Sequence, residues 1–157
     1  MIYTVLETPH VIVGAAIATK IINPALAIPL AFASHFVLEM VPHWNPHLNT
    51  EKKKYGHITD ASKKIVVVDV LAATASGIYI ASLTLPDVNR FLIIILAAFF
   101  SSLPDIIEAP YFFLNLKSAF LDKWVAFQKS LQSDAEIIPG LLTQTATIIA
   151  AFWWILG

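Results

Sequence analysis

Residues 91–116 read FLIIILAAFFSSLPDIIEAPYFFLNL, and this stretch decides the fold. A helix needs about 20 mostly apolar residues to cross the hydrocarbon core of a bilayer. The stretch exceeds that length and contains no lysine or arginine, and its only charged residues are Asp105 and Glu108. It therefore predicts a membrane-spanning helix that carries an acidic pair.

Similar apolar stretches lie on both sides of this one. Three of them are long enough to span a bilayer, and a fourth is short enough to be a short span, a half-helix or an interfacial segment. They are residues 24–41, 65–85 and 137–156, and the shorter 11–22. The sequence therefore predicts an all-α fold, a polytopic integral membrane bundle of four to five helices. Residues 1–157 then form a single membrane-embedded domain.

The composition supports a membrane protein. Apolar residues make up 57% of the chain and charged residues 13%, with a mean hydropathy of +0.72. Soluble domains are nearer 45–50% apolar and about 25% charged, so an ordinary soluble globule and a disordered chain are both disfavoured. The alternative is a soluble bundle with a very apolar core. Net charge −1 gives no reason to expect nucleic-acid binding, and the lack of cysteine excludes disulfides and thiolate metal sites.

The N-terminus does not read as a signal peptide, because no basic residue precedes the first apolar run and Glu7 stands there instead. Two polar connections, residues 42–64 and 117–136, carry most of the lysines. These are Lys52, Lys53, Lys54, Lys63, Lys64, Lys117, Lys123 and Lys129. Two spans separate the connections, so both lie on one side, which the positive-inside rule makes cytoplasmic. The 42–64 segment is thus expected as a cytoplasmic loop, and the amphipathic 117–136 segment as interfacial.

With this orientation, the ionisable residues of the spans gather near the cytoplasmic side. All five histidines and four carboxylates can meet on one face of the bundle, with His47 and His57 as solvated loop residues. The convergent residues are His10, His35, His43, His47, His57, Glu39, Asp69, Asp105 and Glu108. This convergence is the most informative feature of the sequence.

Carboxylates inside a membrane need compensation, because a charged side chain at mid-bilayer costs at least ~2.5–3.5 kcal/mol. Lys20 and Arg90 fall on the opposite side, so the carboxylates are protonated, hydrated in a cavity or bound to a cation. Nearby histidines favour the cation, since imidazole with carboxylate suits Zn, Mn, Fe or Ni better than Mg or Ca. His35 and Glu39 are four residues apart on one helix and therefore share a face.

Each of these residues also has a simpler interpretation. His35 could be a buried histidine with a satisfied hydrogen bond, and Glu39 could reach water near the interface. Asp69 could cap or bond a neighbouring helix. Asp105 and Glu108, three residues apart on one face, could form a proton relay. Pro104 predicts a kink in their helix, and kinked helices at membrane depth line cavities or pack in protein.

Three motifs resemble the membrane-bound metal-dependent hydrolase family and, more distantly, the zinc-dependent phospholipase C group. They are TPHVIVGAAIA (8–18), SHFVLEMVPHW (34–44) and LPD (103–105). The resemblance implies that His10, His35, Glu39 and Asp105 are metal ligands, with Asp69 and His43 at the same site. It also implies hydrolysis of a phosphoester by a metal-activated water.

The sequence departs from the family at two places. Position 39 is Glu where Asp is expected, and residues 127–130 contain no histidine where some relatives carry a histidine pair. The favoured cofactor is Zn, with Mn or Fe as alternatives.

The sequence thus predicts a membrane-bound metal-dependent hydrolase of a phosphoester, lipid-linked or otherwise, in the cell membrane. Glu108 or Asp69 would take the proton from the attacking water, and lysines of the 52–64 region would attract an anionic lipid headgroup. The partners expected are membrane lipids and no nucleic acid. The alternatives are a non-catalytic protein stabilised by a metal, favoured by the missing histidines, and a proton-coupled transporter subunit.

Overall fold

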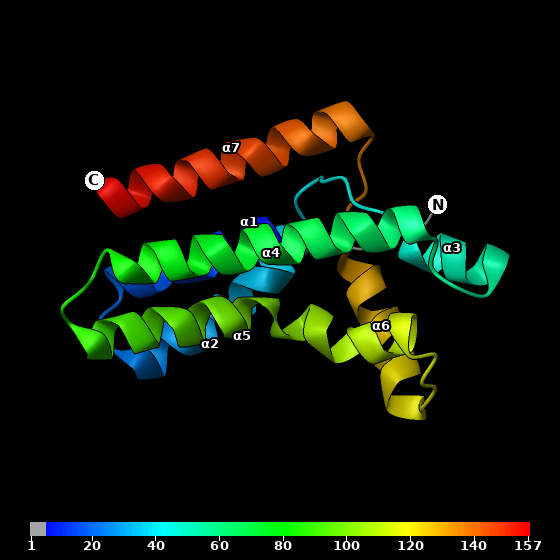
Figure 1. Cartoon of the computed structure of the whole chain (residues 1–157), viewed down its shortest axis with the longest axis horizontal. Coiled ribbons are helices and arrows are strands. Elements are labelled where there is room, and N and C mark those ends of the chain that lie inside the picture. Colours follow the sequence, from blue (N-terminus) through cyan, green and yellow to red (C-terminus); the bar gives the residue numbers. More distant parts are fainter. Residues whose placement is uncertain (1–5) are drawn as a thin grey trace.

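The computed structural model describes residues 6–157, which form seven α-helices (Figure 1). The helices are α1 (Glu7–Lys20), α2 (Pro24–Glu39), α3 (Leu48–Tyr55), α4 (Asp60–Ser82), α5 (Val88–Phe113), α6 (Ala119–Leu131) and α7 (Ile137–Leu156). Within the described residues, the β-type pairing is a single isolated bridge between His43 and Asp134. The predicted all-α class is confirmed.

The five apolar stretches become α1, α2, α4, α5 and α7, and the two polar connections hold the additional helices α3 and α6. Only α4, α5 and α7, among residues 6–157, are long and apolar enough to cross a membrane. With 14 and 16 residues, α1 and α2 reach about 21 and 24 Å, less than the ~30 Å of a hydrocarbon core. The expectation of four to five helices is therefore corrected to seven, of which three have spanning length.

Prolines and polar residues explain why α1 and α2 are short. Asn23 is extended, with φ −73° and ψ 113°, because the residue before a proline avoids the helical conformation. Its side chain accepts a hydrogen bond from the backbone N–H of Ala25 and so caps α2. Pro42 follows the other end of α2 after Glu39, where the chain leaves the helix.

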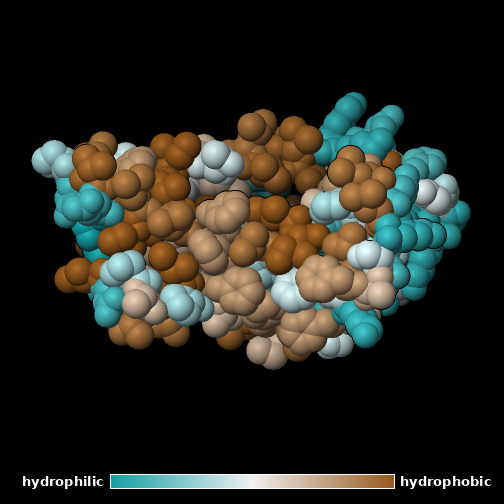
Figure 2. Space-filling view, turned by 90° about the horizontal axis from the view of Figure 1, so that it is seen from below, coloured by the Kyte–Doolittle hydropathy of each residue, from teal (hydrophilic) through white to brown (hydrophobic). Residues whose placement is uncertain are grey.

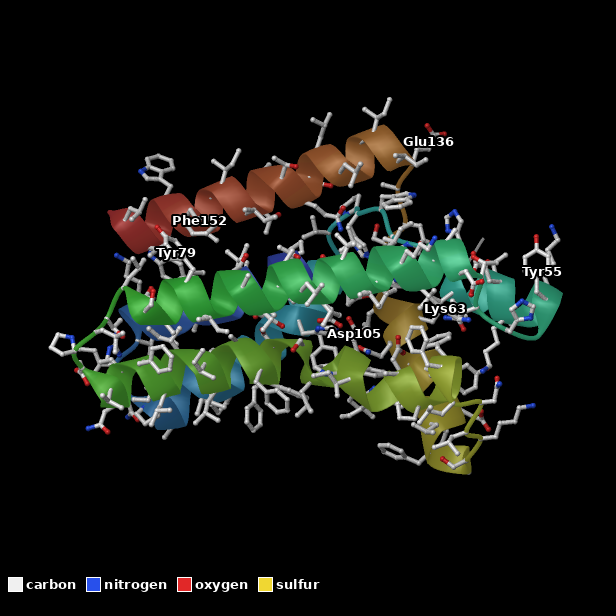
Figure 3. The ribbon with its side chains drawn as sticks, viewed as in Figure 1. Tyr55, Lys63, Tyr79, Asp105, Glu136 and Phe152 are labelled. Atoms are coloured by element: carbon white, nitrogen blue, oxygen red, sulfur yellow. The ribbon has the colours of Figure 1, made fainter. Side chains whose placement is uncertain are left out.

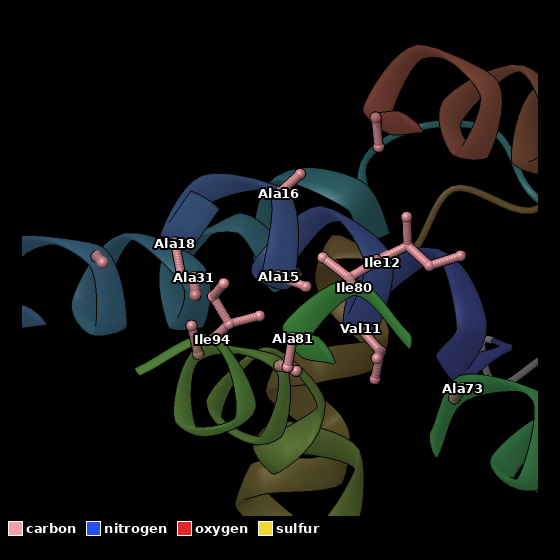
Figure 4. Close-up of a cluster of buried hydrophobic side chains, with 14 residues drawn as sticks. Val11, Ile12, Ala15, Ala16, Ala18, Ala31, Ala73, Ile80, Ala81 and Ile94 are labelled. Atoms are coloured by element: carbon pink, nitrogen blue, oxygen red, sulfur yellow. The ribbon is translucent and has the colours of Figure 1, made fainter. Parts of the chain in front are cut away.

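The helix α1 lies at the centre and contacts α2, α4, α5 and α7. Small side chains at its surface let the neighbouring helices approach closely, as in many membrane bundles. A Cβ added at Gly14 would lie 2.5 Å from the Cβ and Oγ of Ser101 on α5. The buried cluster around α1 is accordingly rich in alanine, as Figure 4 shows for Ala15, Ala16 and Ala81. Close packing of α1 against α5 therefore fixes the position of both helices near the site.

The outer faces of the long helices are apolar and exposed. Val68 on α4 is 66% exposed, and Ile138 and Trp153 on α7 are more exposed still. In Figure 2, hydrophobic residues cover the middle of the visible face, and hydrophilic residues gather at its two ends. This distribution is the one expected of a bundle whose sides face lipid and whose ends face water.

The helices α3 and α6 lie at the same end of the bundle, opposite the link between α4 and α5 (Figure 1). The backbone N–H of Ser133 donates to the carbonyl of Glu39, and that of Ala135 donates to the carbonyl of His43. These hydrogen bonds tie the two polar connections together. They agree with the prediction that both connections lie on one side of a membrane, whereas the cytoplasmic assignment of that side stays a prediction.

Glu51 fastens α3 to the start of α4. Its carboxylate accepts hydrogen bonds from the Thr59 N–H (2.8 Å), the Thr59 hydroxyl (2.9 Å) and the Ser62 hydroxyl (2.7 Å). Burial alone would raise the pKa of Glu51, but these hydrogen bonds outweigh it and hold the pKa below its ordinary value. The ionised form of Glu51 therefore stabilises this corner of the fold.

The helix α6 packs against α5 at the point where α5 bends. Pro104 and Pro110 lie inside α5, and Figure 1 shows the axis of this helix bending along its length. Pro104 has no backbone N–H and so leaves the carbonyl of Phe100, four residues earlier, without its usual donor. At this bend the Trp124 indole N–H of α6 donates to a different carbonyl, that of Pro104, at 3.0 Å. The bend predicted at Pro104 is thus where the amphipathic helix docks.

Candidate metal centre

Three side chains from three helices converge inside the bundle: His10 of α1, His35 of α2 and Asp105 of α5. One possible ligand atom from each lies within 4.8 Å of the others. Both histidines are completely buried. Figure 3 shows Asp105 in the space between α4 and α5, away from the ends of the bundle. The described residues therefore contain a histidine–histidine–aspartate group that could hold a metal ion.

Glu39 joins this group from the last turn of α2. Its Oε1 lies 3.5 Å from His10 Nε2 and 3.9 Å from His35 Nε2, and the Asp105 Oδ1 lies 3.6 Å from the same His35 nitrogen. The four-residue spacing of His35 and Glu39 puts both on one face of α2. The structure thus brings together the four residues that the resemblance implies as ligands, and their metal-binding role stays a prediction.

A backbone hydrogen bond orients His35. Its Nδ1 lies 2.9 Å from the carbonyl oxygen of Ser101 on α5, so that nitrogen carries the proton and donates to the carbonyl. Nε2 is directed at Glu39 and Asp105. Metal-binding histidines usually donate their second ring N–H in this manner, which fixes the tautomer and the ring orientation. His10 stacks on His35, with ring centroids 4.3 Å apart.

Several polar atoms of the group are buried without a hydrogen-bond partner among the described residues. They are both ring nitrogens of His10, Nε2 of His35, Oε1 of Glu39 and Oδ2 of Asp105. Such atoms are rare in folded proteins because each costs free energy, and a bound ion or water is the usual explanation. Imidazole with carboxylate is a donor set that suits Zn, Mn or Fe. The residues present therefore fit a divalent transition metal.

His43 lies beside the group but outside the set of three. It lines a cavity of about 20 Å³ together with His10, and its Nδ1 is 2.6 Å from the carbonyl oxygen of Val41. Burial lowers the pKa of His43, although the Val41 carbonyl opposes the shift. The imidazole is thus kept neutral, as metal binding requires. Its role as a ligand stays a prediction.

Asp69 caps the start of α1. Its carboxylate accepts hydrogen bonds from the Thr8 hydroxyl (2.6 Å), the Thr8 N–H (3.3 Å) and the Glu7 N–H. A helix N-terminus has unpaired N–H groups that a carboxylate satisfies well. Capping was the simpler interpretation of Asp69 from the sequence, and it accounts for this side chain. A catalytic role for Asp69 stays untested.

Glu108 is buried one turn after Asp105 on α5. It lines a cavity of about 120 Å³ with Asp105, Asp69 and Glu7, which we call the acid cavity. Asp105 belongs both to the lining of the acid cavity and to the metal-binding group. Glu108 is therefore placed to act on a molecule that approaches Asp105.

Sequence reasoning missed two residues of this region. Gln128 of α6 is buried, and its amide nitrogen donates to Asp105 Oδ1 at 3.1 Å. Glu7, three residues before His10 on α1, lies close enough to Asp105 and Glu108 to interact electrostatically with both. The sequence offered a signal for each: Gln128 follows Val125 on the face of an amphipathic helix, and Glu7 precedes a histidine by one helical turn.

The loop histidines do not join the centre. His57 is exposed, with Nδ1 3.0 Å from the Tyr55 carbonyl oxygen, in agreement with a solvated residue. His47 directly precedes α3.

Lys52 donates hydrogen bonds to the Asn115 side chain at 2.8 Å and to the Tyr111 carbonyl, so it fastens α3 to the end of α5.

Comparison with known proteins adds no relative to this picture. No protein-family model matches the chain, no curated protein matches it, and no solved structure matches it. The resemblance to membrane-bound metal-dependent hydrolases therefore rests on the three short motifs, and the candidate centre rests on its own geometry.

Proposed function

We propose that this protein is a membrane-embedded, metal-dependent hydrolase of phosphoesters. The observation that supports the proposal is the convergence of His10, His35 and Asp105, with Glu39, in a buried group in which several polar atoms have no hydrogen-bond partner among the described residues. The favoured metal is Zn, held by these four side chains with His43 beside them. Three helices of spanning length support placement in a membrane. We assign the lysine-rich end to the cytoplasmic side of the cell membrane.

A catalytic metal site needs a side that remains open to water and substrate, whereas a structural metal site is closed by protein ligands. The histidine side of the candidate centre is closed, because His10 and His35 are completely buried. The Asp105 side is different, since its side chain keeps some exposure and lines the acid cavity. This asymmetry favours a hydrolase over a metal site that only stabilises the fold.

A metal bound here would polarise the phosphoryl oxygens and lower the pKa of water in the site. Glu108 would accept a proton from the attacking water as that oxygen forms its bond to phosphorus. The ester oxygen would leave as an alcohol after taking the proton back from Glu108. Gln128 would hold Asp105 in place through its amide. Lys53 and Lys54, exposed at the same end of the molecule, would attract an anionic headgroup.

Elemental analysis of the purified protein tests the metal. Wild-type protein should retain a divalent transition metal, and Asp105→Ala should lose it. Asp122→Ala is the matched control, because Asp122 is exposed on α6 and does not belong to the metal-binding group. The metal content of this variant should equal that of the wild type. Wild-type protein that binds no divalent transition metal would contradict the proposal.

Glu108→Gln separates catalysis from binding. Glutamine keeps the size and hydrogen bonding of glutamate but cannot take a proton. Metal content should stay at the wild-type level, and hydrolysis of phosphoesters should fall by ~10²–10⁴-fold, as for loss of a general base. Metal loss in this variant would make Glu108 a ligand instead. Full metal occupancy without hydrolysis of any phosphoester in a broad panel would favour the non-catalytic alternative.

A further inference from the structure

We infer that a groove between α4 and α5 binds one hydrocarbon chain of a phospholipid substrate, whose phosphate then lies at the acid cavity. We call it the chain groove. The inference rests on the proposed function, because it names the class of phosphoester that the centre acts on.

The chain groove is an apolar space of about 340 Å³. Its size is at the lower end of the ~300–1,000 Å³ of ligand-binding pockets. Small residues leave the space open at its base, where Ala73 and Gly77 of α4 face Ala98 of α5. The two helices pack closely at Gly77, where an added Cβ would lie 3.5 Å from the Ala98 Cβ and 3.2 Å from Val11 Cγ1. Beside this contact, the side chains of α4 and α5 leave the chain groove unfilled.

The chain groove and the acid cavity adjoin each other. Glu7, Val70 and Ile106 line both spaces. Asp105 and Glu108 line the acid cavity and not the chain groove. Apart from Glu7, the residues that line the chain groove are almost entirely apolar. A molecule that fills both spaces therefore needs a polar group at one end and a hydrocarbon chain at the other, as a phospholipid has.

The chain groove also opens toward the surface that faces lipid. Ile78 on α4 is 51% exposed and Phe99 on α5 is 47% exposed, and both line the groove. Both helices have spanning length, so their exposed faces contact the bilayer in the proposed arrangement. A lipid chain can thus move sideways from the bilayer into the groove without leaving an apolar environment.

The shape of the groove favours a single chain over a helix from another protein. A helix with its side chains is about 10–12 Å wide, much wider than an extended hydrocarbon chain. A helix from a second copy would therefore cover the mouth of the groove and leave its base empty. An extended hydrocarbon chain is thin enough to reach Ala73 and Gly77.

Photolabelling tests this inference. The probe is phosphatidic acid with a diazirine on one acyl chain, added to the purified protein in phosphatidylcholine vesicles and irradiated. Mass spectrometry should place the label on groove residues such as Thr74, Ile78 and Phe99. Thr74→Phe, which fills the groove, should reduce this labelling to the level without irradiation. Val68→Phe is the matched control, because Val68 is exposed on the same helix and lines neither space, and labelling should persist.

Two further readouts separate this inference from the proposed function. Labelling of the metal-loaded protein in the groove without any hydrolysis would uphold the groove and contradict the hydrolase. Thr74→Phe should slow hydrolysis of phosphatidic acid but leave hydrolysis of water-soluble p-nitrophenyl phosphate unchanged. If Thr74→Phe does not fold, Ile78→Trp at the mouth replaces it, with the same expected loss. Labelling spread evenly over the lipid-facing residues, and unchanged in the filled variant, would overturn the inference.

Discussion

Gln128→Met should weaken metal binding by about 10- to 100-fold. Methionine keeps the length of glutamine but removes the amide that donates to Asp105 Oδ1 at 3.1 Å. Gln128 is only 5% exposed, so water cannot easily replace the lost donor. Partners that hold a metal ligand in place typically contribute a factor of 10–100 in metal affinity.

Two independent estimates give the same magnitude. The factor of 10–100 corresponds to about 1.4–2.8 kcal/mol of binding free energy. A hydrogen bond to a charged group contributes ~1.5–3 kcal/mol. The Gln128 amide donates one such bond to the Asp105 carboxylate, so its loss accounts for the whole range.

The assay is a competition titration of Zn²⁺ against a chromophoric chelator, on metal-depleted protein in detergent. Lys129→Met is the matched control, because the same residue is introduced one position away on the exposed side of α6. Its dissociation constant should equal that of the wild type. A dissociation constant for Gln128→Met within twofold of the wild-type value would refute the positioning role of Gln128.

Three other predictions concern the fold. Gly14→Ala places a Cβ 2.5 Å from a side chain of α5, so we expect the free energy of unfolding in detergent to fall by about 1–3 kcal/mol. The pKa of Glu51 in the folded protein lies below 4.5, the ordinary pKa of glutamate. Ionised Glu51 therefore stabilises the fold fully above pH 4.5, and this contribution is lost as the pH falls through the lower folded-state pKa. The difference in thermal midpoint between wild type and Glu51→Gln should therefore shrink below pH 4.5, and a constant difference would contradict this. Single cysteines at Thr50 and Ser130, in a chain without native cysteine, should be labelled from one side of the membrane and one at Asn89 from the other.

The sequence predicted the helices well because hydropathy and proline positions act locally. Residues 65–82 of the apolar stretch and the polar residues before them become one helix, since Thr59 provides a cap that the hydropathy pattern does not detect. The central position of α1 was not predictable, because a 14-residue apolar segment is equally suited to a short span or an interfacial segment. Only contacts with four other helices decide between these.

The candidate metal centre was predictable only where its residues lie close together in the sequence. His35 and Glu39 share a face by their spacing alone. The approach of His10 to Asp105 depends on how α1 packs against α5, which the resemblance implied and the spacing did not. Gln128 escaped notice because α6 was expected to lie in the membrane interface, whereas its inner face docks against the bend of α5.

The central position of α1 has a consequence for biosynthesis. This helix is synthesised before every other helix in the described part of the chain, but its partners are synthesised later. The Asp69 carboxylate accepts hydrogen bonds from N–H groups at the start of α1, and Asp105 completes the metal-binding group around His10. Until those residues emerge from the ribosome, the polar groups of α1 lack the partners that a membrane environment demands. Nascent chains that stop before Asp105 thus carry exposed polar groups within an apolar helix, a feature by which a cell can distinguish incomplete chains from finished ones.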